Sequence, residues 1–227
     1  MKSSDTVAMT LPADHYRTKK RALSLDELLA DGIVHALALL AGFIAFPILL
    51  YHALQTAGIG TFAALTVYAT GFFLMWGFSL AYNMTPPSAL KWLLRRFDHS
   101  MIYVMIAGTY TAVIPHLDGA WAWGLGIVVW SGAALGILVK VLLPGRYDRL
   151  AILAYILLGW VGVIAIGPVT AVLPSVSLWL LAAGGVTYVA GVVFYVWERL
   201  RFQNAIWHGF VAVAAGLHFA AVAVAVA

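Results

Sequence analysis

Three pairs of polar residues in this chain are spaced by one helical turn, and their side chains could bind a metal ion, move a proton or hold a polar group. Residues four apart lie about 40° from each other around a helix and therefore share one face. The pairs are Asp31 with His35, Ser79 with Asn83, and Asn204 with His208, and a further acidic and imidazole pair, Asp98 with His99, is adjacent in sequence.

The absence of cysteine narrows the chemistry of any site in this chain. Without thiols the chain has no disulfides, no thiolate zinc site and no thiol catalysis. A site must therefore be built from imidazole, carboxylate, hydroxyl and amide groups.

The elements that position these residues are membrane helices. Of all residues, 63% are hydrophobic and 10% charged, whereas soluble domains average about 25% charged. Apolar runs of this length cross the hydrocarbon layer as helices, because every backbone polar group needs a partner within the chain. We predict an all-α bundle of seven transmembrane helices within residues 32–227, after a polar arm of residues 1–31 without a removable signal peptide, with spans at 32–53, 60–84, 100–117, 120–142, 150–170, 175–197 and 204–226.

The distribution of basic residues predicts how this bundle is oriented. All 13 Lys and Arg residues fall on one side of the seven predicted spans. The positive-inside bias places the N-terminus in the cytoplasm and the C-terminus outside. The net charge of +4 then belongs to a cytoplasmic rim that meets lipid headgroups, so we expect membrane lipids and no nucleic acid as partners. The predicted location is a cell membrane, as a multi-pass protein of the bacterial inner membrane.

This topology brings the polar residues to one mouth of the bundle. Spans one, three and seven begin on the cytoplasmic side, and span two ends there, so we predict a polar pocket formed by Ser79, Asn83, Asp98, Asn204 and His208, joined by His35. Other interpretations remain open for single members. Asp98 could instead cap the third span, and His35 could serve only as a hydrogen-bonding residue between helices. The deeper His218 is interpreted as a packed, hydrogen-bonded core histidine.

Several stretches of the chain together resemble the hemolysin III branch of the progestin and adipoQ receptor family. They are residues 26–35, 94–115, 136–160, 184–202 and 204–219. The resemblance implies a seven-helix bundle with its N-terminus inside and a zinc site near the cytoplasmic face. In that family a Ser-x-x-x-His pattern in span two and a His-x-x-x-His pattern in span seven hold the metal, and an Asp at the start of span three places its water. A wider superfamily, which includes alkaline ceramidases, uses similar groups to hydrolyse lipid amides.

This chain departs from the family pattern at two of the three metal-binding positions. Its patterns read Ser79-x-x-x-Asn83 and Asn204-x-x-x-His208. Carboxamides are poor zinc ligands, so only His208 remains as a metal ligand of the family type, and zinc is disfavoured as a cofactor. His35 or His99 could substitute for a missing imidazole.

Two functions follow from these residues. The first is a membrane protein that binds lipid, or acts in membrane homeostasis or signalling, with a degenerate zinc site; the asparagines favour it. The alternative is a zinc-dependent, ceramidase-like lipid amide hydrolase. Its catalytic residues would be Asp98 as base or water-orienting group, Ser79 near the developing oxyanion and His208 as ligand.

Overall fold

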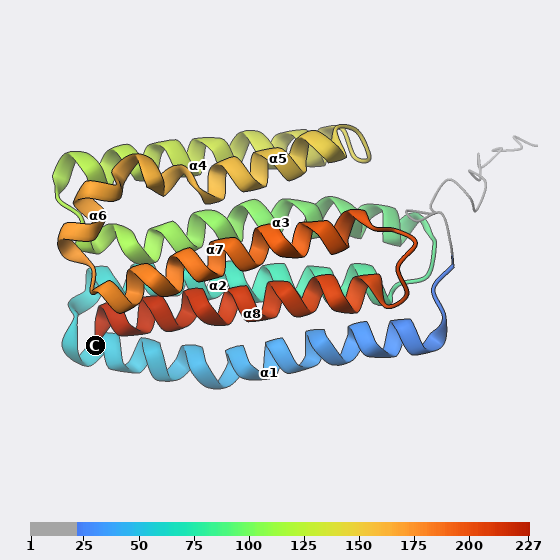
Figure 1. Cartoon of the computed structure of the whole chain (residues 1–227), viewed down its shortest axis with the longest axis horizontal. Helices are drawn as coiled ribbons and strands as arrows, with labels where there is room; N and C mark the ends of the chain where they lie inside the picture. Colours follow the sequence, from blue (N-terminus) through green and yellow to red (C-terminus); the bar gives the residue numbers. More distant parts are fainter. Residues whose placement is uncertain (1–21) are drawn as a thin grey trace, which may run out of the picture.

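Long helices that run back and forth make up residues 22–227, which are the part of the chain that the computed structural model describes (Figure 1). No strand occurs in these residues, so the predicted all-helical architecture is confirmed. The helices are α1 (Leu25–Thr56), α2 (Gly58–Met84), α3 (Ala89–Val113), α4 (Gly119–Leu142), α5 (Asp148–Gly159), α6 (Ile166–Val172), α7 (Ser175–Val196) and α8 (Gln203–Val226), with short 3-10 turns at η2 (Ile114–His116) and η3 (Val161–Ala165).

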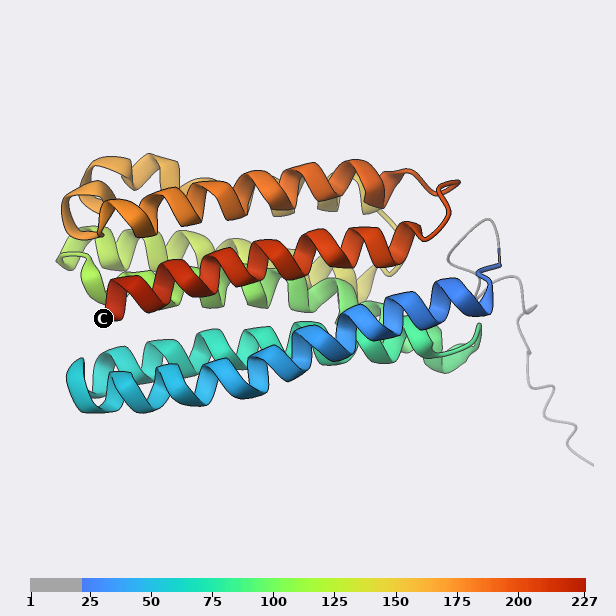
Figure 2. The same cartoon turned by 60° about the horizontal axis from the view of Figure 1, so that its bottom comes forward.

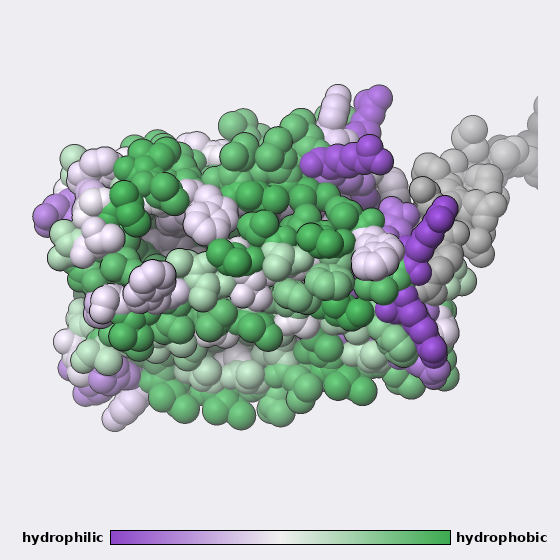
Figure 3. All heavy atoms as spheres, in the orientation of Figure 1, coloured by the Kyte–Doolittle hydropathy of each residue, from purple (hydrophilic) through white to green (hydrophobic). Residues whose placement is uncertain are grey.

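Six helical segments in the described part are long and apolar enough to cross a membrane: α1, α2, α4, the stretch Asp148–Val172, α7 and α8. The flanks of the bundle between its two ends are covered by apolar side chains (Figure 3). Such a surface is stable against lipid and not against water. The chain is therefore a multi-pass membrane protein. The helix α3, with 25 residues, is about as long as α4 and α8, but charged residues lie in its first turns.

One end of the bundle, which we call the basic end, carries the starts of α1, α3, α5 and α8. Hydrophilic side chains gather at this end, on the right of Figure 3. The described Lys and Arg residues lie in or near its loops: Lys91, Arg95, Arg96, Lys140, Arg146, Arg149, Arg199 and Arg201.

The helix α1 begins at Leu25, within the segment that we predicted as a polar arm; residues 1–21 of that arm lie outside the described part. A capping box explains this start, because Ser24 Oγ accepts the Glu27 N–H at 3.3 Å and Glu27 Oε2 accepts the Ser24 N–H at 3.0 Å. The other oxygen of the same carboxylate, Oε1, accepts the N–H of Phe202 at 2.9 Å. Glu27 thus joins the first turn of α1 to the start of α8. Figure 2 shows α1 running obliquely, with its first turns close to α8.

The segment predicted as one span at 150–170 is broken into α5, η3 and α6. A helix break exposes backbone polar groups, which must find other partners in an apolar surrounding. Tyr110 of α3 supplies one of them. Its hydroxyl donates to the Gly159 carbonyl at 2.7 Å and accepts from the Gly162 N–H at 2.9 Å.

Close packing of α2 against α3 fixes the two elements that carry much of the polar cluster. A Cβ atom added to Gly108 would lie 3.3 Å from the Tyr68 Cα, so the two backbones approach as closely as glycine allows. Large side chains from α1 and α2, Phe46, Tyr68 and Trp76, fill the space beside this crossing and are almost fully buried. The polar residues of α2 and α3 are consequently held on a rigid pair of helices.

Candidate functional site

Five of the residues singled out in the sequence line a single cavity and lie toward its basic end. They come from three helices: Ser79 and Asn83 from α2, Asp98 from α3, and Asn204 and His208 from α8. His35 does not line this cavity. It lies behind Ser79, at 0% exposure, where its Nε2 is 3.1 Å from the Ser79 Oγ.

Asp31, which sequence reasoning did not place in the pocket, is as deeply buried as His35. Its carboxylate Oδ1 accepts the His208 Nδ1–H at 2.6 Å, across the interface of α1 and α8, and Asp31 is 0% exposed. The backbone carbonyl of the same residue accepts the His35 Nδ1–H at 2.8 Å. The signal in the sequence was the four-residue spacing of Asp31 and His35, an acidic and an imidazole group on one face of an apolar helix.

These contacts fix the protonation pattern of both imidazoles. A carbonyl or a carboxylate only accepts, so Nδ1 carries the proton in His35 and in His208. A ring that is neutral and carries its proton on Nδ1 presents an unprotonated Nε2. Both of these nitrogens face the Ser79 hydroxyl, His35 at 3.1 Å and His208 at 3.4 Å. The two rings pack edge to face with their centroids 4.3 Å apart, and Trp76 covers His35 at 5.2 Å.

Asn83 and Asn204, which stand where the family resemblance implies imidazoles, bind each other. The Asn204 amide donates to the Asn83 Oδ1 at 3.2 Å. Asn83 Nδ2 donates in turn to the Ser79 carbonyl at 2.9 Å and to the Ser79 Oγ at 3.3 Å. The carboxamides are therefore part of a hydrogen-bonded network that orients Ser79.

Three residues with metal-binding groups meet in this cluster. One possible ligand atom from each of Asp31, His35 and His208 lies within 4.8 Å of the other two. The Asp31 Oδ2 is buried and has no hydrogen-bond partner in the described part of the chain. The geometry of these three residues suits a cation.

Asp98 takes a position that the sequence left open. The idea that it caps the third span is wrong, because α3 begins at Ala89 with Ser88 as its N-cap, and Asp98 lies more than two turns inside. Its carboxylate pairs with the His99 Nδ1 at 3.1 Å and is 14% exposed. Asp98 is thus available to a molecule in the cavity. The deeper His218 donates to the Leu181 carbonyl at 3.2 Å, as expected of a hydrogen-bonded core histidine.

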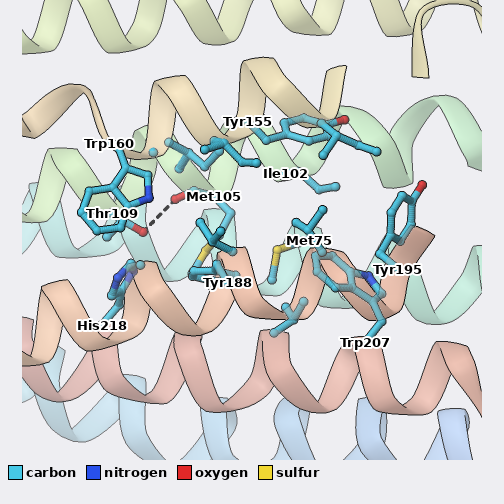
Figure 4. Close-up of a pocket in the computed structure, with 18 of the residues that line it drawn as sticks. Met75, Ile102, Met105, Thr109, Tyr155, Trp160, Tyr188, Tyr195, Trp207 and His218 are labelled. Atoms are coloured by element: carbon cyan, nitrogen blue, oxygen red, sulfur yellow. Dashed lines mark hydrogen bonds between the residues drawn. The ribbon is translucent and has the colours of Figure 1, made fainter. Parts of the chain in front are cut away.

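The cavity itself has a volume of about 660 Å³ and runs along the bundle between α3 and α5 on one side and α7 and α8 on the other. Its walls are mainly apolar and aromatic. In Figure 4, Met75, Met105 and Tyr188 point into its middle, while Trp160 and His218 lie farther from the basic end. A long apolar space with polar groups at one end matches the shape and chemistry of a lipid.

Charged residues of both signs line the basic end of the cavity: Arg95 and Arg149, with Asp98, Asp148 and Glu198. One carboxylate, Asp148, accepts from Arg95 Nη2 at 2.6 Å and from Lys140 Nζ at 2.8 Å. Arg95 and Lys140 are both buried, so two cations share one anion inside the bundle. Arg95 and Arg149 are the cationic side chains of the cavity lining here, so they are the groups that a negatively charged part of a bound molecule would contact.

Comparison with known proteins gives a consistent result. The sequence model of the family described as "Haemolysin-III related" matches residues 27–219. Hemolysin-3 of Bacillus cereus is 36% identical over 189 residues, which cover 82% of this chain and 86% of the relative. A Hemolysin-3 homolog of Bacillus subtilis (strain 168) is 32% identical, covering 83% and 89%. The monocyte to macrophage differentiation factor of Homo sapiens is 32% identical over 127 residues, or 55% of this chain and 52% of the relative.

The Asp31 carboxylate should contribute measurably to stability. The Asp31→Ala variant leaves the buried His208 Nδ1–H without an acceptor, so we expect its free energy of unfolding in detergent to fall by about 2 kcal/mol or more. Asp26→Ala is the matched control, because Asp26 lies on the same helix at 71% exposure and its loss should cost less than about 1 kcal/mol. Denaturant unfolding, followed by tryptophan fluorescence, measures both. Equal losses in the two variants would contradict the proposed importance of the α1–α8 contact.

Proposed function

Because the chain belongs to the hemolysin III family, within the progestin and adipoQ receptor family, we propose that it is a seven-helix protein that binds a membrane lipid through the cavity and the polar cluster. The observation that carries this proposal is the cavity, which is apolar along its length and polar at its basic end. Binding of this kind suits a role in membrane homeostasis or signalling.

In the proposed bundle α3 also spans the membrane, which brings the number of spans to seven. Residues after Ser100 in α3 are mostly apolar, and they pack between α2 and α4. The basic end then faces the cytoplasm under the positive-inside bias, and the end of α8 lies outside. Two of the relatives come from bacteria, which supports a place in the bacterial cell membrane, the inner membrane where a cell has two.

Reporter fusions test this orientation. Alkaline phosphatase fused after Ala227 should be active, because we expect this end of the chain outside the cytoplasm. Green fluorescent protein fused at the same place should not fluoresce. A fusion after Gly145, in the loop between α4 and α5 at the basic end, serves as the control and should give the opposite result. If the reporters after Ala227 and after Gly145 are both in the cytoplasm, α3 does not span the membrane.

In the proposed complex, an acyl chain lies along the apolar wall formed by Met75, Met105 and Tyr188. The headgroup lies at the basic end, where Ser79 and the amides offer hydrogen bonds. Arg95 and Arg149 line the cavity at this end, and they favour a lipid whose headgroup carries phosphate, since guanidinium groups bind phosphate strongly.

Photo-cross-linking tests the lipid site. A phosphatidylglycerol with a diazirine on one acyl chain should label cavity residues of the purified protein. Filling the cavity with Val192→Trp should lower the labelling by at least about tenfold, a loss of 1.4 kcal/mol in binding. Val193→Trp is the matched control, because Val193 is 58% exposed on the outer face of the same helix and should change nothing. Labels confined to outward-facing residues would exclude the cavity as the site.

One observation favours a second candidate, hydrolysis of a lipid amide. Asp31 Oδ1, the His208 ring and Ser79 Oγ form a chain of contacts at 2.6 Å and 3.4 Å, in the order carboxylate, imidazole, hydroxyl. In hydrolases this order lets the imidazole take a proton from the hydroxyl while the carboxylate orients the ring. Ser79 and His208 border the cavity, so a bound acyl group could reach them, and Asp98 is placed to orient water.

Release of fluorescent fatty acid from a nitrobenzoxadiazole-labelled ceramide tests this second candidate. If the cluster is catalytic, Ser79→Ala and His208→Gln should each lower the rate by at least about 10³-fold. Thr109→Ala removes another cavity hydroxyl, one that donates to the Met105 carbonyl, and should leave the rate unchanged. Equal rates in Ser79→Ala and the unmodified protein would eliminate hydrolysis by these residues.

A further inference from the structure

We propose that the cavity holds a second polar subsite, formed by Trp160 and His218, which binds a hydroxyl group on the acyl chain of a lipid. The proposal rests on the proposed lipid binding and names the kind of chain that fits. Two hydrogen-bonding groups carry it, because they lie deep in a mainly apolar cavity and away from the polar cluster at the basic end.

His218 offers a hydrogen-bond acceptor to the cavity. Its Nε2 lies 3.2 Å from the Leu181 carbonyl, which only accepts, so Nε2 carries a proton. Within the described part of the chain no carboxylate pairs with His218, and an uncompensated charge is costly in an apolar bundle, so the ring is neutral. Its Nδ1 is therefore an acceptor, and it has no hydrogen-bond partner among the described residues.

Trp160 offers a hydrogen-bond donor. Its indole N–H can only donate, and it has no partner within residues 22–227. Trp160 lies at the break between α5 and η3. The Tyr110 hydroxyl binds the backbone on both sides of it, at the Gly159 carbonyl and the Gly162 N–H. These two bonds hold the backbone that carries the Trp160 ring.

Two consecutive glycines of α7 place both rings against this one helix. A Cβ atom added to Gly185 would lie 3.0 Å from the Trp160 Cζ2, and one added to Gly184 would lie 2.6 Å from the His218 Nε2. Because the two glycines are neighbours in sequence, Trp160 and His218 contact α7 at nearly the same level. Both side chains also line the cavity, and Figure 4 shows them away from its basic end.

The spacing along α8 gives the depth of this subsite. His218 comes ten residues after His208, so it lies about 15 Å farther from the basic end. Between these two levels the wall is apolar and aromatic, with Met75, Met105 and Tyr188. A lipid with its headgroup at the basic end therefore brings the second half of a long acyl chain to Trp160 and His218.

A donor and an acceptor together match a hydroxyl group. A hydroxyl accepts from the Trp160 N–H and donates to the His218 Nδ1, whereas a keto oxygen only accepts and a methylene group does neither. An unsubstituted chain would cover both groups and leave them without partners, which lowers its affinity. The subsite therefore prefers a hydroxylated chain to a plain chain of the same length.

Competition against the diazirine-labelled phosphatidylglycerol, with the full-length protein in detergent, tests this preference. The competitors are two lysophosphatidylglycerols, one with an oleoyl chain and one with a ricinoleoyl chain. These chains differ only in a hydroxyl group, which lies in the second half of the ricinoleoyl chain. We expect the ricinoleoyl lipid to bind at least about tenfold more tightly, because it gives both polar groups a partner.

Variants test whether Trp160 and His218 cause the preference. His218→Leu removes the acceptor and Trp160→Phe removes the donor, so each should lower the preference to about twofold or less. Trp207→Phe is the matched control, because Trp207 lines the same cavity nearer the basic end and should keep the full preference. Unchanged binding of the oleoyl lipid shows that a variant is still folded.

Three results would overturn the proposal. Equal binding of the two lipids by the unmodified protein would leave lipid binding in place and remove the hydroxyl subsite. A full preference in both His218→Leu and Trp160→Phe would place the bound hydroxyl elsewhere in the cavity. If neither lipid competes and no cavity residue is labelled, the proposed lipid binding fails, and the subsite fails with it.

Discussion

The hydrogen bond from His208 Nδ1 to the Asp31 carboxylate joins the first described helix to the last, and the polar cluster depends on it. The bond is 2.6 Å long, and its acceptor, the Asp31 carboxylate, lies at 0% exposure within an apolar bundle. It fixes the position of α1 along α8, and the contact of Glu27 with Phe202 fixes the same pair one turn nearer the basic end. His35, on the same face as Asp31, is thereby brought to Ser79.

Two compartments result from this arrangement. Asp31 and His35 are closed off at 0% exposure, whereas Ser79 and His208 border both the buried pair and the cavity. Ser79 and His208 therefore form a wall between the buried pair and the cavity. A change in the charge of Asp31 or His35 would reach a molecule in the cavity through these two residues. The proposed lipid binding and the proposed hydrolysis both depend on this wall, although each uses a different set of its atoms.

The sequence predicted the features that depend on local pattern. Hydropathy gave the helical segments, the Lys and Arg residues identified one end of the bundle, and four-residue spacing placed Ser79 and Asn83 on one face. It did not predict features that depend on distant partners. The break after α5 relies on Tyr110 of α3, and the role of Asp31 relies on the approach of α1 to α8. Hydropathy also placed the third span at 100–117, because the first turns of α3 are helical yet charged.

The Asp31–His208 contact also sets a condition on biosynthesis. The two residues are 177 positions apart, so at bacterial or eukaryotic translation rates of 5–20 residues per second, Asp31 waits roughly 10 to 35 seconds for its partner. During that time the first helix carries an uncompensated carboxylate. A chain that stops before α8 never forms this contact, so its Asp31 carboxylate stays without the His208 N–H.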